Sequence, residues 1–404
     1  MPFIVTLLSD FGSGSPYPAQ MKIVLASSCE AMLIDITHDV PRHDIRAGGY
    51  LLAAGCLRSR RTAMPAGGWD DQSNPAWRET IVLLPEVSTL IVSLPVFPVC
   101  PVFPVDRAKL TAWRVPARRP GRLGRRGRPG RLLPTESAMP VIVTLLSDFG
   151  SGSPYPAQMK VVLASWCEAV LIDITHDVPR HDVRAGAYLL AAVARTTPAG
   201  TVHLAVVDPG VGTTRRPLII ASGGQVFIGP DNGLLLPAAN RAGRPRAFEI
   251  IAPEILQSVS SSTFHGRDIF APLAARLVRG TPPQVLGRAV EDFVDLTLGV
   301  GRRVGNALRG EILYVDTFGN LITNIPAGEL GREGAVIHLT VGRRRARAAA
   351  ARTYGDVARG RIAVVPGSDG LLEIAVREGS AADYFAAGRA TKIRIILGPA
   401  RNIS

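Results

Sequence analysis

Three short polar segments of the sequence combine residue types that could do chemistry. Asp208 opens the run DPGVGTTR, in which two glycines allow a tight turn and Arg215 closes the loop with a guanidinium. His265 lies in the run TFHGRD, a polar break before an apolar stretch. The run DTFGNLITN, residues 316–324, places an aromatic ring between Asp and Asn and could hold a purine. Together these groups could position water, move a proton and bind a nucleoside.

Each segment also has an ordinary structural reading, which the residues alone leave open. DPGVGTTR could be a turn with a surface ion pair, a single histidine is more often structural than catalytic, and DTFGN could be a plain β-turn. Two further runs are weaker candidates. GSGS after Asp148 lacks the pattern of a phosphate-binding loop, and HDVPRHD, residues 176–182, matches no common set of metal ligands. We therefore expect no metal site.

The elements that must position these segments alternate between strand and helix from residue 140 onward. Strand-like runs end at three polar tips, Asp148, Thr175–Asp177 and Asp208, with amphipathic runs between them. PLIIASGGQVFIGPDNG then reads as a β-hairpin that turns at Gly223 and Gly224. This alternation predicts an α/β domain with a largely parallel sheet. Ligands bind such sheets at the carboxyl ends of the strands.

After about Gly299 the strand-like runs follow one another without strong helices between them. RGEILYVDTFGNLITNI, AVIHLTV, GRIAVVPGSDGLLEIAV and ATKIRIIL are of this kind. We predict a smaller all-β C-terminal domain, a barrel or sandwich, with the boundary near Val300. The α/β domain would then span residues 139–299 and the β-rich domain residues 300–404.

The start of the α/β domain occurs twice in the chain. SDFGSGSPYPAQMK runs from Ser9 and again from Ser147, and residues 1–55 match residues 139–193 at a constant offset of 138 with seven differences. The first copy contains Asp10, but no DPGVGTTR, TFHGRD or DTFGN follows it before the second copy begins. With two strands and two helices at most, it would make a poor core. We interpret residues 1–55 as a truncated duplicate without a working site of its own.

Residues 56–138 separate the two copies and are rich in Pro, Gly and Arg. Without helical or strand periodicity, they are predicted to be a disordered linker. An apolar patch from Thr80 to Val105 contains prolines and Glu86, which argues against a membrane span. The segment holds fourteen Lys or Arg and six Asp or Glu, so it supplies +8 of the formal net charge of +13. A nucleic-acid footprint should lie on a folded face, so we expect no nucleic-acid partner.

The cysteines and the N-terminal residues bear on the compartment. None of the four cysteines forms a C-x-x-C pair, so neither a disulfide framework nor a zinc site is indicated. The opening run MPFIVTLLSDFG lacks the basic region of a secretory signal. We expect a cytoplasmic protein.

In order and spacing, the motifs of the second copy and the β-rich region resemble the S-adenosylmethionine hydroxide adenosyltransferases, hydrolases related to the fluorinase and chlorinase. The motifs are SDFG, DITHDVP, DPGVGTTRRP, GPDNG, TFHGRDIFAP, DTFGNLITNI and GSDGLLEIA, and the resemblance covers residues 140–398. It implies cleavage of S-adenosyl-L-methionine by water to adenosine and L-methionine, without a metal or cofactor. It also implies an α/β domain followed by a β-domain, and a homotrimer with active sites at subunit interfaces.

The resemblance also assigns roles to individual residues. Asp208, Arg215 and His265 would hold and activate the attacking water, with either Asp208 or His265 as the base. The substrate contacts would be Asp148 at the ribose hydroxyls, Asp316 at the methionine ammonium, Phe318 and Asn320 at the adenine, and Ser368 near the methionine carboxylate.

Two differences from family patterns bear on the reaction. The fluorinase pattern has tyrosines in place of Asp208 and His265 and a halide-binding serine in place of Gly266. A carboxylate repels an anion, so hydroxide is favoured over halide as the nucleophile. Many family members carry Asp where this chain has Ser153, which removes an ionic contact to the amino-acid end of the substrate. The alternatives are a protein that binds or senses S-adenosylmethionine without cleaving it and, less favoured, a halogenase.

Overall fold

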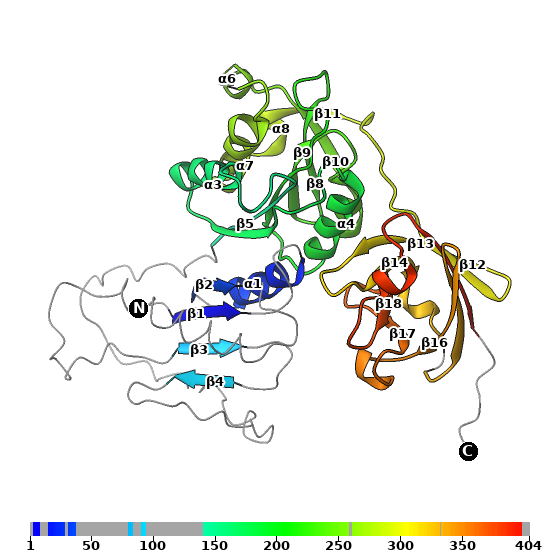
Figure 1. The fold of residues 1–404 in the computed structure, drawn as a ribbon. Helices are drawn as coiled ribbons and strands as arrows, with labels where there is room; N and C mark the ends of the chain where they lie inside the picture. Colours follow the sequence, from blue (N-terminus) through cyan, green and yellow to red (C-terminus); the bar gives the residue numbers. More distant parts are fainter. Residues whose placement is uncertain are drawn as a thin grey trace, which may run out of the picture. The chain divides into compact units, whose positions relative to one another are not determined.

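The computed structural model describes residues 3–8, 15–28, 31–37, 80–83, 90–93, 140–257, 261–331 and 333–397. The chain divides into two compact units (Figure 1). The first unit comprises residues 1–9, 30–37 and 45–140, and the second comprises residues 10–29, 38–44 and 141–404. The second unit contains every candidate site residue named above.

The first unit contains a four-stranded sheet in the order β2-β1-β3-β4. Its strands are β1 (Phe3–Leu8), β2 (Ala31–Thr37), β3 (Thr80–Leu83) and β4 (Leu90–Ser93). β1 and β2 pair in parallel with a register shift between Leu7 and Leu8, and their duplicates β5 and β6 pair in parallel with a shift between Leu145 and Leu146. The duplicated sequence therefore repeats its local strand pairing. β3 and β4 lie within the stretch predicted to be a linker, and the rest of that stretch lies outside the described residues.

The second unit begins with a helix, α1 (Tyr17–Ser28), followed by a seven-stranded sheet in the order β11-β10-β8-β9-β7-β5-β6. The strands are β5 (Ile142–Ser147), β6 (Val170–Thr175), β7 (Val202–Val206), β8 (Pro217–Ser222), β9 (Gln225–Pro230), β10 (Arg246–Ile250) and β11 (Gly287–Val290). β6, β5, β7 and β9 are parallel, whereas β8, β10 and β11 run antiparallel to their neighbours. The predicted α/β class is confirmed. The predicted hairpin is also confirmed, because Ser222 pairs with Gln225 across Gly223 and Gly224.

Helices cover both faces of this sheet (Figure 1). They are α3 (Tyr155–Trp166), α4 (Val183–Ala194), α5 (Leu236–Ala242), α6 (Pro253–Leu256), the π-helical turn η2 (Gly266–Phe270), α7 (Ala271–Val278) and α8 (Pro283–Leu286). α3 packs with α7, and α4 packs with α5. α3 connects β5 to β6, and α4 connects β6 to β7 on the other side of β5. Because the two connections run in opposite directions across the sheet and both are right-handed, α3 and α4 lie on opposite faces. The core between sheet and helices includes Leu145, Leu204 and Phe270, which are fully or almost fully buried.

The C-terminal domain is a closed barrel. Seven strands form its ring in the order β13-β14-β18-β17-β16-β15-β19, and the pairing of β13 with β19 closes it. The strands of the domain are β12 (Arg302–Val304), β13 (Ala307–Val315), β14 (Leu321–Pro326), β15 (Val336–Val341), β16 (Arg344–Ala350), β17 (Ile362–Pro366), β18 (Leu371–Val376) and β19 (Lys392–Leu397), with the short helical turns η3 (Ala327–Glu329), η4 (Tyr354–Asp356) and α9 (Ala381–Phe385). Of the two predicted architectures, the barrel is confirmed. The last strand of the α/β sheet ends at Val290 and the first barrel strand begins at Arg302, on either side of the predicted boundary at Val300.

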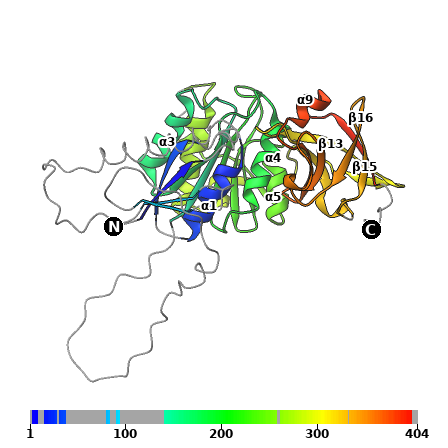
Figure 2. The ribbon, with the colours of Figure 1, turned by 60° about the horizontal axis from the view of Figure 1, so that its bottom comes forward.

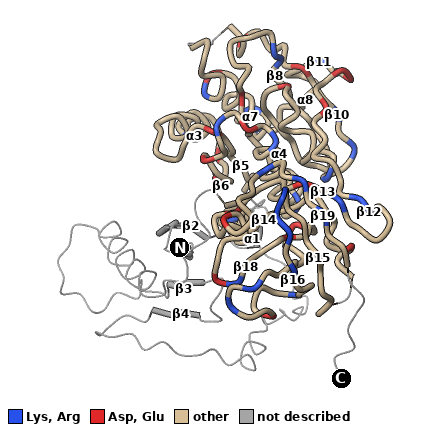
Figure 3. The backbone as a smooth tube through the Cα atoms, turned by 45° about the vertical axis from the view of Figure 1, so that its right-hand side comes forward, with Lys and Arg blue, Asp and Glu red and all other residues tan. Residues whose placement is uncertain are grey.

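α4 joins the two domains of the second unit. It packs on β5 and β6 and also against β13 of the barrel, so residues 185–194 are buried on almost every side. Figure 2 shows α1 near α4, and the structure records contacts of α1 with β6 and α4. Figure 3 shows basic and acidic residues interspersed along the described chain. Within the described residues, no helix is long and apolar enough to cross a membrane.

Candidate active site

Asp208 and Arg215 form a buried ion pair at the carboxyl edge of the α/β sheet. Asp208 follows β7, and the glycine-containing loop returns Arg215 to it. The Arg215 Nε lies 3.0 and 2.9 Å from the two carboxylate oxygens, and its Nη2 also contacts Oδ2. The two side chains are 5% and 9% exposed. Such bidentate geometry fixes the carboxylate and guanidinium in one plane.

His265 completes this group. Its Nδ1 lies 2.8 Å from Nη2 of Arg215. A guanidinium N–H can only donate, so Nδ1 accepts, and the neutral ring carries its proton on Nε2. Burial, followed by the positive charge of Arg215, lowers the pKa of His265 below its usual value, while Asp208 and Asp268 oppose the shift. The imidazole is therefore neutral at pH 7 and presents an N–H donor.

Glycines bring the backbone close to these side chains. A Cβ at Gly210 would lie 3.2 Å from Cγ of Arg215, and Gly212 has a φ of +77°. A Cβ at Gly266, next to His265, would lie 2.8 Å from the Met159 sulfur. The two glycine-containing motifs therefore let two loops converge on Arg215.

Asp148 lies at the same edge of the sheet. It follows β5, which pairs with β7 so that Ser147 is opposite Val206. Its Oδ2 accepts a hydrogen bond from the His181 N–H at 2.9 Å. His181 has a φ of +61°, an uncommon conformation for a residue with a side chain. The Asp148 contact helps hold the loop that carries it.

The runs with phosphate-like and metal-like patterns form turns and caps. Asp177 accepts from the Ser151 N–H at 2.8 Å and so closes the GSGS loop. Asp182 accepts from the Ala185 N–H at 2.9 Å and caps α4. In the described part of the chain, no three His, Cys, Asp or Glu side chains gather in a way that could hold a metal ion.

A second group of predicted residues lies on the barrel. Asp316 follows β13, and its two oxygens accept hydrogen bonds from the backbone N–H and the side-chain amide of Asn320, at 2.8 and 2.9 Å. Both side chains belong to residues that are 7% exposed. Phe318, in the same turn, is partly buried, and Ser368 is exposed in the turn between β17 and β18. The structure thus joins Asp316 and Asn320 directly, on a different domain from Asp208.

Several polar residues around this second group were missed by the sequence reasoning. Asp369 accepts a hydrogen bond from the Tyr188 hydroxyl at 2.8 Å, and Tyr188 stacks on Tyr314 with ring centres 5.6 Å apart. Glu373 is 3% exposed and accepts a hydrogen bond from the Tyr354 hydroxyl. The signal for Glu373 was a single carboxylate inside the apolar run LLEIAV.

Burial dominates the electrostatics of this carboxylate cluster. It raises the pKa of Glu373 to about 7, with Asp316 and Asp369 adding to the shift and the Tyr354 hydrogen bond opposing it. Because Glu373, Asp316 and Asp369 lie close together, their mutual repulsion opposes the ionisation of all three carboxyl groups at once. A cationic ligand group placed among them would relieve that repulsion.

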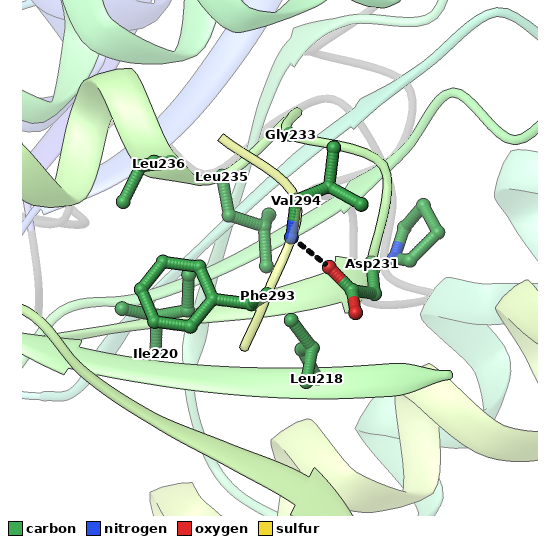
Figure 4. Close-up of a pocket in the computed structure, with 9 residues that line it drawn as sticks. Leu218, Ile220, Asp231, Gly233, Leu235, Leu236, Phe293 and Val294 are labelled. Carbon is green, nitrogen blue, oxygen red and sulfur yellow. Dashed lines mark hydrogen bonds between the residues drawn. The ribbon is translucent and has the colours of Figure 1, made fainter. Parts of the chain in front are cut away.

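A small recess elsewhere in the α/β domain has different chemistry (Figure 4). It lies beside Phe293 and Val294 and is lined mainly by apolar side chains such as Leu218. The one carboxylate among the described residues lining it, Asp231, accepts from the Val294 N–H at 2.8 Å and pairs with Arg216. An apolar recess whose carboxylate is already paired offers little to a nucleoside.

Comparisons with known proteins agree on one family. The family model described as the SAM hydroxide adenosyltransferase N-terminal domain matches residues 5–67 and 143–287, and the model of the C-terminal domain matches residues 310–394. The chain is 41% identical to a protein of Salinispora tropica named (R)-S-adenosyl-L-methionine hydrolase, over 63% of this chain and 98% of that one. A protein of the same name from Thermus thermophilus is 38% identical, over 63% and 99%.

A relative of lower identity and a solved structure are also similar to this chain. A fluorinase of an Actinoplanes species is 28% identical over 48% of this chain and 74% of that one. The crystal structure of an uncharacterized conserved protein from Thermotoga maritima superposes with a TM-score of 0.61 at 36% identity, covering 63% of this chain and 100% of that one.

Proposed function

The chain belongs to the S-adenosylmethionine hydroxide adenosyltransferase family, and from that premise we propose that it hydrolyses S-adenosyl-L-methionine to adenosine and L-methionine. Residues 139–404 carry this activity. The observation that supports it most strongly is the buried contact of Asp208 and Arg215 with His265. We extend to this chain the (R) configuration that the names of its relatives specify.

The chemistry requires a nucleophile more than an acid. The sulfonium of the substrate leaves as a neutral thioether, so methionine needs no proton to depart. A water oxygen attacks the ribose C5′ in line, the C5′–S bond breaks with its electron pair going to sulfur, and one proton leaves the water. Holding that water behind C5′ and accepting its proton are the tasks of the protein.

The hydrogen bonds favour Asp208 over His265 as the base. Nδ1 of His265 is occupied by Arg215 and its Nε2 carries a proton, so the ring has no ready acceptor for the proton from water. Asp208 retains carboxylate lone pairs beyond those used by Arg215. In this account Asp208 takes the proton, Arg215 stabilises the developing hydroxide, and His265 donates a hydrogen bond to the same oxygen.

The surroundings of Gly266 favour hydroxide over halide. A serine at this place, as in the fluorinase pattern, would bring its Cβ within 2.8 Å of the Met159 sulfur and 3.2 Å of the Phe264 ring. Met159 would have to move before a hydroxyl could be accommodated. The Asp208 carboxylate nearby also repels a halide anion, whereas a neutral water can approach it and give up its proton to it during the attack.

The remaining predicted residues bind the substrate. Asp148 accepts hydrogen bonds from the ribose hydroxyls, and Asp316, within the acidic cluster, faces the methionine ammonium. Phe318 and Asn320 contact the adenine, and Ser368 lies near the methionine carboxylate. Because these contacts come from two domains, we propose that a homotrimer forms each complete site between subunits, that no metal or cofactor takes part, and that the protein works in the cytoplasm.

The test is chromatography of S-adenosylmethionine after incubation with the protein, for both sulfonium configurations and with or without chloride or fluoride. Equal amounts of adenosine and methionine, independent of halide and lost in Asp208→Ala, are expected. A 5′-halo-adenosine would instead identify a halogenase. Tight binding without product would identify a binding protein, a role consistent with Ser153, whose hydroxyl is buried without a partner among the described residues.

A further inference from the structure

α3 exposes apolar side chains on its outward side. Tyr155, Val161 and Trp166 are 46%, 64% and 48% exposed, and Ala157 between them is also exposed. The inward side of the same helix is buried in the core through Met159. Large exposed apolar side chains on a short helix are typical of a contact surface.

α1 has nearly the same sequence but buries the opposite side. YPAQMKIVLASS in α1 differs from YPAQMKVVLASW in α3 at two of twelve positions. Ile23, the counterpart of Val161, is 0% exposed, and Ala19, the counterpart of Ala157, is also 0% exposed. Positions 157 and 161, which α3 leaves exposed, thus correspond to positions that α1 buries.

α1 packs onto a surface that we call the α1 seat, formed by β6, α4 and the turn of residues 367–370. Gln20 donates from Nε2 to the Ala192 carbonyl at 3.2 Å and to the Asp369 carboxylate at 3.4 Å. The Tyr17 side chain shares a hydrogen bond with the side chain of Ser368. Apolar contact and matched polar contacts together define where this helix sequence fits.

Tyr17 also enters the acidic cluster of the barrel. Burial raises the pKa of its hydroxyl well above the usual value, and the nearby carboxylates of Glu373, Asp369 and Asp316 add to the effect. Asp316 and Ser368 are the residues to which we assign the methionine end of the substrate. α1, which belongs to the first copy of the duplicated sequence, therefore lies against the barrel half of the proposed site.

Because the two helix sequences are nearly identical, the α1 seat of one chain also fits the outward side of α3 from a second copy. We propose that α1 occupies, within its own chain, the seat that α3 of a second copy would take, so that the first copy restrains self-association of the full chain. The consequence for turnover rests on the proposed function. While α1 lies on its own barrel, the catalytic group of a neighbour cannot reach Asp316 and Ser368, so turnover of the full chain comes from the fraction of chains in which α1 has left the α1 seat.

The test uses matched variants of the full chain, measured by sedimentation velocity or light scattering without substrate. Ile23→Asp places a carboxylate at a fully buried position and releases α1, so the mass rises about threefold for the proposed trimer. The wild-type chain is mainly monomeric. Val161→Asp, at an exposed position, stays monomeric, and the double variant is monomeric because the α3 contact is also removed. Ile23→Val, which copies α3, behaves as wild type.

Three results would overturn the proposal. These are a wild-type chain that is already mainly trimeric, an Ile23→Asp chain that remains monomeric, or an association that persists in the double variant. Since mass is read without substrate, failure here is separate from failure of the proposed activity. An Ile23→Asp chain that associates but forms no adenosine contradicts the activity and leaves the assembly proposal standing.

Discussion

Neutralising Glu373 should stabilise the protein above neutral pH. Burial raises the pKa of Glu373 from 4.5 to about 7 in the folded state. A raised pKa means that the folded state holds its proton more tightly, so the associated stability is fully present below pH 4.5 and is lost as pH rises through 7. The shift corresponds to about 3 kcal/mol at 1.36 kcal/mol per pKa unit. Glu373→Gln keeps a hydrogen-bond acceptor for Tyr354 but removes the charge.

Urea unfolding at pH 4.5 and pH 8.5, followed by tyrosine and tryptophan fluorescence, measures the effect. At pH 8.5 the Glu373→Gln variant should be more stable than wild type by up to about 3 kcal/mol, and at pH 4.5 the two should agree. Glu333→Gln, at a side chain 51% exposed, is the matched control and should change little at either pH. If the Glu373→Gln variant is no more stable than wild type at pH 8.5, burial does not raise the pKa of Glu373 as described.

Three further outcomes are expected. Asp208→Asn should reduce adenosine formation at least about 100-fold, with substrate binding by calorimetry nearly unchanged, because it removes the base. Gly266→Ser should cost about 1–3 kcal/mol in urea unfolding, because its Cβ would approach the Met159 sulfur at 2.8 Å, and it should yield no halogenated product. Burial lowers the pKa of His203 from 6.5 to about 4. The free energy of unfolding should therefore fall by about 3 kcal/mol as pH drops from 6.5 to 4. In the His203→Gln variant, urea unfolding should show a much smaller fall over the same pH range.

The sequence predicted the fold where its patterns were strong. The parallel strands ending at Asp148 and Asp208 are present, as is the closed barrel. β16 was missed because RRARAAA lacks the β-branched and aromatic residues that mark strands. Its pairing with β15 across Gly342, rather than local propensity, makes it a strand.

The sequence also indicated part of the candidate site. The order of the motifs predicted that Asp208, Arg215 and His265 act together, and the structure places them in direct contact. The acidic cluster around Glu373 could not be predicted, because a carboxylate in an apolar strand gives no sign of what faces it. Nor could the seating of α1, because a repeated sequence carries no indication that its copies pack with opposite sides.

In the proposed reaction, a water positioned by Asp208 attacks the ribose carbon of S-adenosylmethionine. Turnover in water enriched in oxygen-18, analysed by mass spectrometry, tests it most directly, with the wild-type and Ile23→Asp chains side by side. We expect one heavy oxygen on the 5′ carbon of adenosine and none in methionine. Adenosine without the label, or no adenosine from either chain, would contradict it.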